Sequence, residues 1–158
     1  MPQNRERIII VGFKDHNVHF DFPKPYNYGV KLGDILEKTP DEKYTISSSA
    51  WEFLKRRKEL QKAKGNGFGY CLFDENSPYT STITARYYKD GSEILIAQKN
   101  KNPRKLTIRE AARLQGFPDD FKIVCSNTQA YKQFGNSVST KMIHEVAKQI
   151  FMALKKLK

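Results

Sequence analysis

The sequence predicts an α+β fold in which helical and strand-like segments occupy separate stretches of the chain. Apolar residues recur at helical spacing within residues 45–65 and 107–116, and again from about residue 140 onwards. Residues 65–100 contain three strand-like runs separated by turn residues. No repeating strand–helix–strand series is present, so a regular parallel sheet covered by helices is not expected.

The composition favours a nucleic-acid partner. The chain has 28 Lys and Arg residues against 17 Asp and Glu residues, a formal charge of +11 and a pI near 9.6. Such a balance is typical of proteins that bind a polyanion, although charge can also serve solubility alone. The 158 residues, 39% of them hydrophobic, are enough for one domain with a modest core.

Two kinds of site are not expected. The two cysteines and three histidines are too scattered for a disulfide framework or a metal site. No apolar run approaches the ~20 residues that span a membrane. We therefore expect an intracellular protein without a metal and without a membrane segment.

The β-branched run at residues 8–11 predicts a strand that is buried on both faces, as in the middle of a parallel sheet. The sequence offers no obvious parallel neighbours for it. Further along, residues 68–73, 80–88 and 93–98 predict a small twisted sheet, with a hairpin turn at 89–91. Alternation would place one set of polar side chains on a single face of the strand over 80–88: Thr80, Thr82, Thr84, Arg86 and Tyr88. That face suits hydrogen bonding to phosphates and base edges, or it is an ordinary exposed face.

The first predicted helix, within residues 45–65, has a serine cap in the run 47–49 and ends at Gly65. Trp51, Leu54 and Phe53 give it an apolar side. Its second half is strongly basic and is either a solvated face or a phosphate-contacting one.

Two later segments have clear helix signals. Thr107 and Glu110 have the spacing of a capping box, and Gly116 stands where a left-handed residue ends the helix. The chain from about residue 140 has an apolar stripe that requires a surface to pack on. Before it, Gly135 to Ser137 either turn the chain and cap this last helix, or let a small ligand approach bare backbone.

Three segments resemble the last three ordered motifs of DNA (cytosine-5)-methyltransferases: QNRERIIIVGF (3–13), RKLTIREAARLQGFPDDF (104–121) and QAYKQFGNSV (129–138). They occur in the family's order, and the resemblance covers essentially the whole chain. Within the intervening region, KAKGNGFGY and TITARYYKDGSEILI are similar to the target-recognition domains of Dcm-type enzymes, which implies a target of the CCWGG or CCNGG kind.

The resemblance implies part of a methyltransferase fold. Residues 1–22 would supply one strand of the catalytic-domain sheet, and residues 23–121 a small mixed target-recognition domain that includes the motif helix 107–116. Residues 122–158 would return to the catalytic domain, on which the C-terminal helix packs. We expect the C-terminal part of such an enzyme: a separate subunit, a remnant of a broken gene or an expressed fragment.

The resemblance also implies an incomplete active site. The family's nucleophile is a Cys that follows a Pro, and its cofactor site opens with a Gly-rich turn; neither is present. Transfer of a methyl group from S-adenosylmethionine to C5 of cytosine would therefore require the missing N-terminal catalytic half, and the chain alone is predicted to be inactive. Its expected partners are that half and double-stranded DNA in the bacterial cytoplasm, associated with the nucleoid. We also expect the isolated chain to self-associate.

Individual positions acquire roles from the same resemblance. Arg5 and Arg7 would contact the extruded cytosine and its phosphate as auxiliary catalytic residues. The predicted DNA-binding residues are Thr82, Thr84, Arg86, Tyr87, Tyr88 and Lys89, and the predicted cofactor-binding residues are Asn136, Ser137 and Val138. Arg104, Glu110 and Arg113 would brace the recognition domain. The alternative is a stand-alone basic nucleic-acid-binding module without methylation activity.

Overall fold

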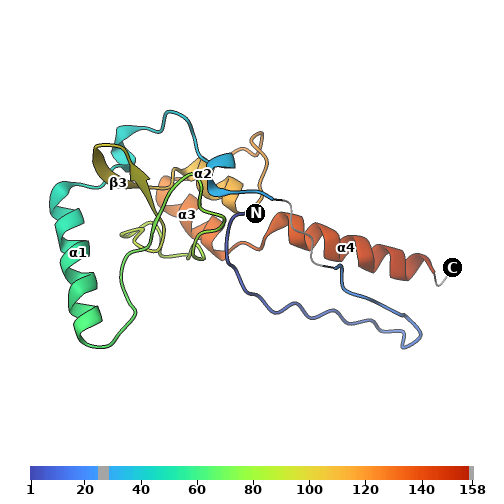
Figure 1. Ribbon diagram of the computed structural model, residues 1–158. Helices are drawn as coiled ribbons and strands as arrows, with labels where there is room; N and C mark the ends of the chain where they lie inside the picture. Colours follow the sequence, from blue (N-terminus) through green and yellow to red (C-terminus); the bar gives the residue numbers. More distant parts are fainter. Residues whose placement is uncertain (25–28, 157–158) are drawn as a thin grey trace.

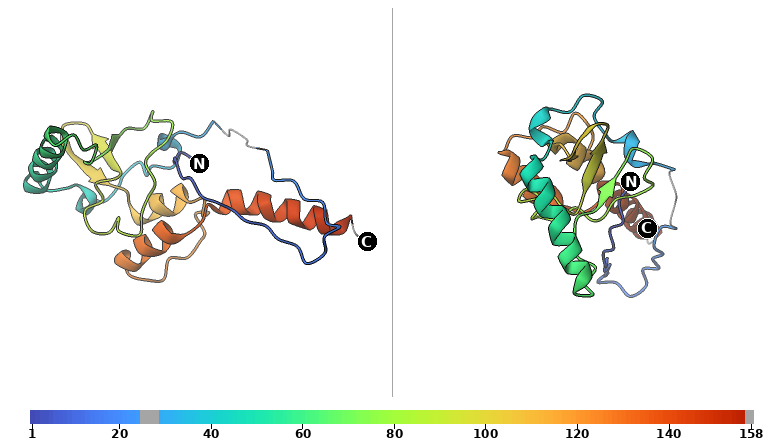
Figure 2. Two further views of the ribbon diagram at one scale, coloured as in Figure 1. Left: turned by 90° about the horizontal axis from the view of Figure 1, so that it is seen from below. Right: turned by 60° about the vertical axis from the view of Figure 1, so that its left-hand side comes forward.

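The protein consists of a body and a projecting arm. The structure, a computed structural model, describes residues 1–24 and 29–156. The body holds a small sheet with helices α1 to α3 around it, while α4 and residues 5–24 extend from it in the same direction (Figures 1 and 2). The helices are η1 (Leu32–Asp34), η2 (Glu42–Tyr44), α1 (Ser48–Ala63), α2 (Ile108–Leu114), α3 (Asn127–Asn136) and α4 (Thr140–Lys155), and the strands are β1 (Leu72–Phe73), β2 (Leu95–Gln98) and β3 (Lys101–Lys105). The predicted α+β class is confirmed.

The sheet has the order β1-β2-β3, with β1 parallel and β3 antiparallel to the central strand. Strands β1 and β2 lie within the predicted runs 68–73 and 93–98. Strand β3 was not predicted, because its sequence, KNPRK, has none of the β-branched or aromatic residues that favour strands.

The predicted strand over residues 80–88 is wrong. Thr80 forms one isolated bridge with Gln3, and the chain then turns at residues 85–88. The threonine hydroxyls are used for contacts that are distant in sequence: Thr82 Oγ1 donates to the Asn4 carbonyl at 2.6 Å. The alternating polar face therefore does not exist.

The predicted helix caps are confirmed. The Ser47 side chain accepts from the Ala50 amide at the start of α1, and Gly65 follows this helix with φ +74°. Thr107 and Glu110 form the capping box of α2, and Gly116 has φ +86°. Both glycines occupy the left-handed conformation that other residues adopt at a cost.

The region before the last helix differs from the prediction. Gly135 and Asn136 are the last residues of α3, a helix that was not predicted, and Ser139 rather than Ser137 caps α4. Helix α4 itself is confirmed, although the predicted range continues to residues 157–158, outside the described part of the chain. None of the described helices is both long and apolar enough to cross a membrane.

The core lies in the body, where α2 packs against α3, and one cluster of buried side chains joins residues of both helices with Ile96 of β2. Tyr87 is fully buried there: its hydroxyl donates to the Ile94 carbonyl and accepts from the Leu106 amide, both at 2.7 Å. Burial raises the pKa of Tyr87 well above its ordinary value. The Tyr131 ring packs edge-on against it at 5.2 Å between centroids.

The predicted buried strand at residues 8–11 is not formed. These residues lie in the arm, and the side chains of Ile8 and Ile10 are 90% and 89% exposed. The run has the composition of a buried strand, but no strand of the described chain lies beside it to complete the backbone hydrogen bonds.

Candidate functional site

The side chain of Arg5 joins three distant segments of the chain. Its Nη1 donates to the Ile83 carbonyl at 3.1 Å, and its Nη2 donates to the carbonyls of Gly135 and Ser137 at 3.1 and 2.7 Å. The guanidinium is partly buried, and desolvation, followed by the nearby Arg7 charge, lowers the pKa of Arg5. A fixed, planar fork of donors suits this task, because one side chain can hold several carbonyls at once.

The predicted contact of Arg5 with an extruded cytosine stays a prediction; in this structure both terminal nitrogens donate to main-chain carbonyls. Its role in this structure is to hold the loop at residues 82–84 against the junction of α3 and α4. Arg7 is exposed, and within the described part of the chain its side chain donates only to the neighbouring Glu6 carbonyl, which leaves it available to a ligand.

Two further features fix the loop at residues 82–85. The Gln3 side chain accepts from the Ile83 amide at 3.0 Å and donates to the Leu114 carbonyl at 3.3 Å. A Cβ atom added at Gly135 would lie under 3.0 Å from the Thr84 carbonyl and the Ala85 amide nitrogen. Gly135 is thus small because the backbone of residues 84–85 packs on it.

The predicted DNA-binding residues divide into two groups. Thr84, Arg86 and Lys89 are exposed on the surface of the turn, and Tyr88 and Thr82 are partly exposed. Thr84 Oγ1 donates to Glu93 at 2.8 Å and accepts from the Arg86 amide at 3.1 Å, which fixes the start of the turn.

Tyr87 is the exception and is a correction to the predicted site. Its ring is inaccessible and its hydroxyl is saturated by two backbone partners, so it anchors the turn from inside instead of contacting DNA. Because a turn of this kind exposes its other side chains, the anchor allows Arg86 and Lys89 to project from a fixed backbone.

The three predicted cofactor-binding residues lie together at the α3–α4 junction. Asn136 and Val138 are exposed, and Ser137 is partly buried with its hydroxyl donating to the Phe134 carbonyl at 2.8 Å. Since Arg5 holds the Ser137 carbonyl, the position of this junction depends on the same side chain that positions residues 82–84.

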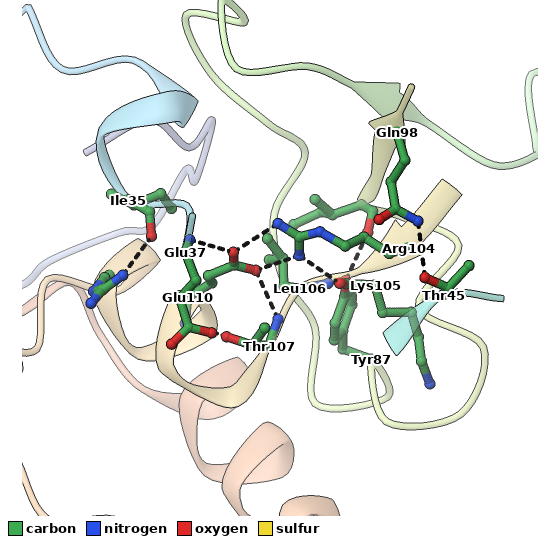
Figure 3. A network of polar contacts seen from close by, with 12 residues as sticks. Ile35, Glu37, Thr45, Tyr87, Gln98, Arg104, Lys105, Leu106, Thr107 and Glu110 are labelled. Atoms are coloured by element: carbon green, nitrogen blue, oxygen red, sulfur yellow. Dashed lines mark hydrogen bonds and ion pairs between the residues drawn. The ribbon is translucent and has the colours of Figure 1, made fainter. Parts of the chain in front are cut away.

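Arg104, Glu110 and Arg113, which were predicted to brace the recognition domain, connect α2 to neighbouring segments. Arg104 and Glu110 form a bidentate ion pair at 2.7 and 2.8 Å that is almost fully buried (Figure 3). Glu110 also accepts from the amides of Glu37 at 2.7 Å and Thr107 at 2.8 Å. Arg113 donates to the Ile35 carbonyl and pairs with Asp119, whose pKa it lowers. These contacts connect α2 to β3 and to the segment after η1.

The substitution Arg5→Gln tests whether the Arg5 side chain holds residues 82–84 against the α3–α4 junction. Loss of the guanidinium removes three charge-assisted hydrogen bonds, each worth roughly 1.5–3 kcal/mol. We expect amide hydrogen exchange to accelerate about tenfold or more in residues 82–86 and 135–139 together, measured by mass spectrometry on the chain. Arg7→Gln is the matched control and should leave both segments unchanged. Faster exchange in only one of the two segments would contradict the conclusion that Arg5 holds both of them.

Comparison with known proteins identifies the family. The model of C-5 cytosine-specific DNA methylases matches residues 1–152. The type II methyltransferase M.SsoII of Shigella sonnei is 60% identical over an alignment 158 residues long that covers 98% of this chain and 42% of the relative. M.NlaX of Neisseria lactamica is 60% identical over 154 residues, covering 98% of this chain and 49% of the relative. The chain belongs to the C-5 cytosine-specific DNA methylase family.

A less similar relative and a solved structure also match this chain. The DNA-cytosine methyltransferase of Escherichia coli K12 is 40% identical over an alignment 178 positions long, gaps included, that covers 94% of this chain and 38% of the relative. The chain thus spans less than half the length of these relatives. Among solved structures, the Entamoeba histolytica methyltransferase EhMeth has a TM-score of 0.66 at 21% identity, covering 91% of this chain and 46% of that one. This last likeness supports the fold alone.

Proposed function

We propose that this chain is the part of a DNA (cytosine-5)-methyltransferase that recognises DNA and completes the cofactor pocket. The complete enzyme would transfer a methyl group from S-adenosylmethionine to C5 of cytosine within a short duplex target such as CCNGG or CCWGG. The observation that carries the proposal is the junction held by Arg5. It joins the first and last matched motifs to the start of the exposed turn with Arg86 and Lys89.

The chemistry assigns separate tasks to the two sides of this junction. The cytosine must leave the base stack, which costs on the order of a few kcal/mol. Arg86 and Lys89 would hold the duplex through base edges and phosphates, while Thr82 and Thr84 keep the turn in place. Arg7 is our candidate for contact with the extruded cytosine or its phosphate, because its guanidinium is exposed.

The residues at the α3–α4 junction fit one edge of a cofactor site. Asn136 presents an amide and Val138 an apolar side chain to solvent, next to a main chain fixed by Arg5. S-adenosylmethionine has polar and apolar parts and would supply the methyl group. We propose that Asn136, Ser137 and Val138 bind it only together with the catalytic half.

The arm supports the need for a second protein body. Ile8, Ile10, Phe151 and Leu154 are between 46% and 90% exposed, and large exposed apolar surfaces mark interaction sites. We propose that these side chains pack on the catalytic half, and that without it the isolated chain self-associates. No proline of the sequence precedes a cysteine, so the nucleophile would come from that half.

Complementation tests the proposal. The part of the Shigella sonnei relative that this chain does not match is produced as a separate polypeptide and mixed with the chain. We expect transfer of tritium from labelled S-adenosylmethionine to duplexes with CCNGG sites in the mixture, and none with either part alone. Transfer by this chain alone would refute the need for a catalytic half. DNA binding without any complementation would favour the stand-alone binding module.

A further inference from the structure

A basic groove lies beside the predicted recognition turn. It has a volume of about 320 Å³ and is lined by residues of η2, the start of α1, the turn and the end of β3. Lys43, Lys89 and Lys105 come from three separate elements and all line it, with Phe53 on one side. Only Lys89 was singled out from the sequence. Lys43 lies in a segment without a recognisable motif, and Lys105 lies in the motif over residues 104–121 but was given no role of its own.

The charge of the groove is positive after its internal pairs are counted. Its one acidic lining residue is Asp90, whose carboxylate accepts from Ser92 at 3.1 and 3.0 Å and lies 3.8 Å from Arg57 of α1. Lys43 pairs with Asp41 at 2.8 Å, with both side chains more than half exposed. Exposed pairs of this kind contribute little and exchange readily for another anion.

The position of the groove indicates which anion it takes. One wall is formed by Lys89 and Asp90, which begin three residues after Arg86, so a duplex seated on the turn would continue across the groove. The exposed guanidinium groups of Arg56 and Arg57 on α1 extend the same positive surface. The spacing of positive charges over several elements suits a continuous backbone of phosphates better than a single small anion.

We propose that this groove binds the sugar–phosphate backbone of duplex DNA outside the recognised base pairs. The inference rests on the proposed function, since the turn must face DNA. Lys43 and Lys105 neutralise flanking phosphates and set affinity, whereas the exposed residues of the turn set target preference. Phe53, which is 63% exposed, lines the groove beside the proposed path of the DNA sugar–phosphate backbone.

The test compares two lengths of DNA. Binding of the 158-residue chain is measured by fluorescence anisotropy with a CCNGG duplex that has about one helical turn of flanking DNA on each side, and with one that has minimal flanks. For the double variant Lys43→Gln/Lys105→Gln we expect affinity for the long duplex to fall roughly five- to thirtyfold near physiological salt. The slope of log affinity against log salt should decrease in magnitude by about 2, because each lost phosphate contact removes about 0.9.

On the minimal duplex the variant and the unaltered chain should bind equally, and the preference for CCNGG over a scrambled duplex should not change. The control is Lys148→Gln/Lys155→Gln, which removes the same charge from α4, at the opposite end of the molecule from α1 (Figure 1). Equal losses on both duplexes, or equal losses in the control, would overturn the inference while leaving the proposed function intact. Failure of the unaltered chain to bind either duplex would refute both.

Discussion

Replacement of Glu110 by alanine should destabilise the chain by about 3–5 kcal/mol, the cost of leaving a buried charged partner unpaired. The Glu110 side chain is 0% exposed and its two carboxylate oxygens accept from the Arg104 guanidinium and from two backbone amides. Truncation leaves both amides without this acceptor and leaves the buried Arg104 guanidinium with no carboxylate partner, so that only its bond to the Lys105 carbonyl remains. The measurement is the free energy of unfolding from urea titration, followed by circular dichroism.

Asp119→Ala provides the control for this experiment. It also removes a carboxylate from a bidentate pair with an arginine of α2, but that carboxylate is exposed to solvent. Its unfolding midpoint should remain close to that of the unaltered chain, because water replaces the lost partner. Similar losses for the two variants would show that burial does not determine the importance of the Glu110 pair.

The second large effect is expected at Gly135. Alanine within a helix normally stabilises by about 1 kcal/mol relative to glycine. Here the added Cβ would lie under 3.0 Å from the main chain at Thr84 and Ala85, and backbone cannot move aside as a flexible side chain can. We expect Gly135→Ala to be destabilising by about 2 kcal/mol or more, as for an overpacked core, measured by the same urea titration.

Gly67→Ala is the matched substitution in open space. A Cβ there meets nothing within 4 Å, and Gly67 is not among the glycines with positive φ. Its stability should therefore change little. Gly135→Ala should also disturb the turn that follows Thr84, so its DNA affinity should fall while that of Gly67→Ala is retained. A stable Gly135→Ala variant would mean that the α3 helix and the loop at residues 84–85 can separate.

Features that depend on neighbouring residues were predictable from the sequence. The capping box of Thr107 and Glu110 and the left-handed Gly116 are fixed by contacts within one or two turns, so their residue types identify them. The same holds for Ser47 at the start of α1. The bracing role of Arg104, Glu110 and Arg113 followed from the family motif and agrees with their contacts.

Features that depend on distant partners were not predictable. The alternating threonines of residues 80–84 resemble a strand, but Thr80 and Thr82 bond the segment at residues 2–4, which is more than 70 positions away. Strand β3 has unfavourable residues and forms because β2 supplies its partner. The three carbonyls that surround the Arg5 side chain belong to residues 83, 135 and 137, and the motif that contains Arg5 does not reveal them.

The inward position of Tyr87 has a consequence for engineering. The turn at residues 85–88 keeps its shape through one internal tyrosine whose hydroxyl links the carbonyl of Ile94 to the amide of Leu106. Libraries intended to alter sequence preference should therefore hold Tyr87 constant and randomise its neighbours Arg86, Tyr88 and Lys89. If the turn contacts DNA as we propose, selection from such a library would sample new DNA contacts on an unchanged scaffold.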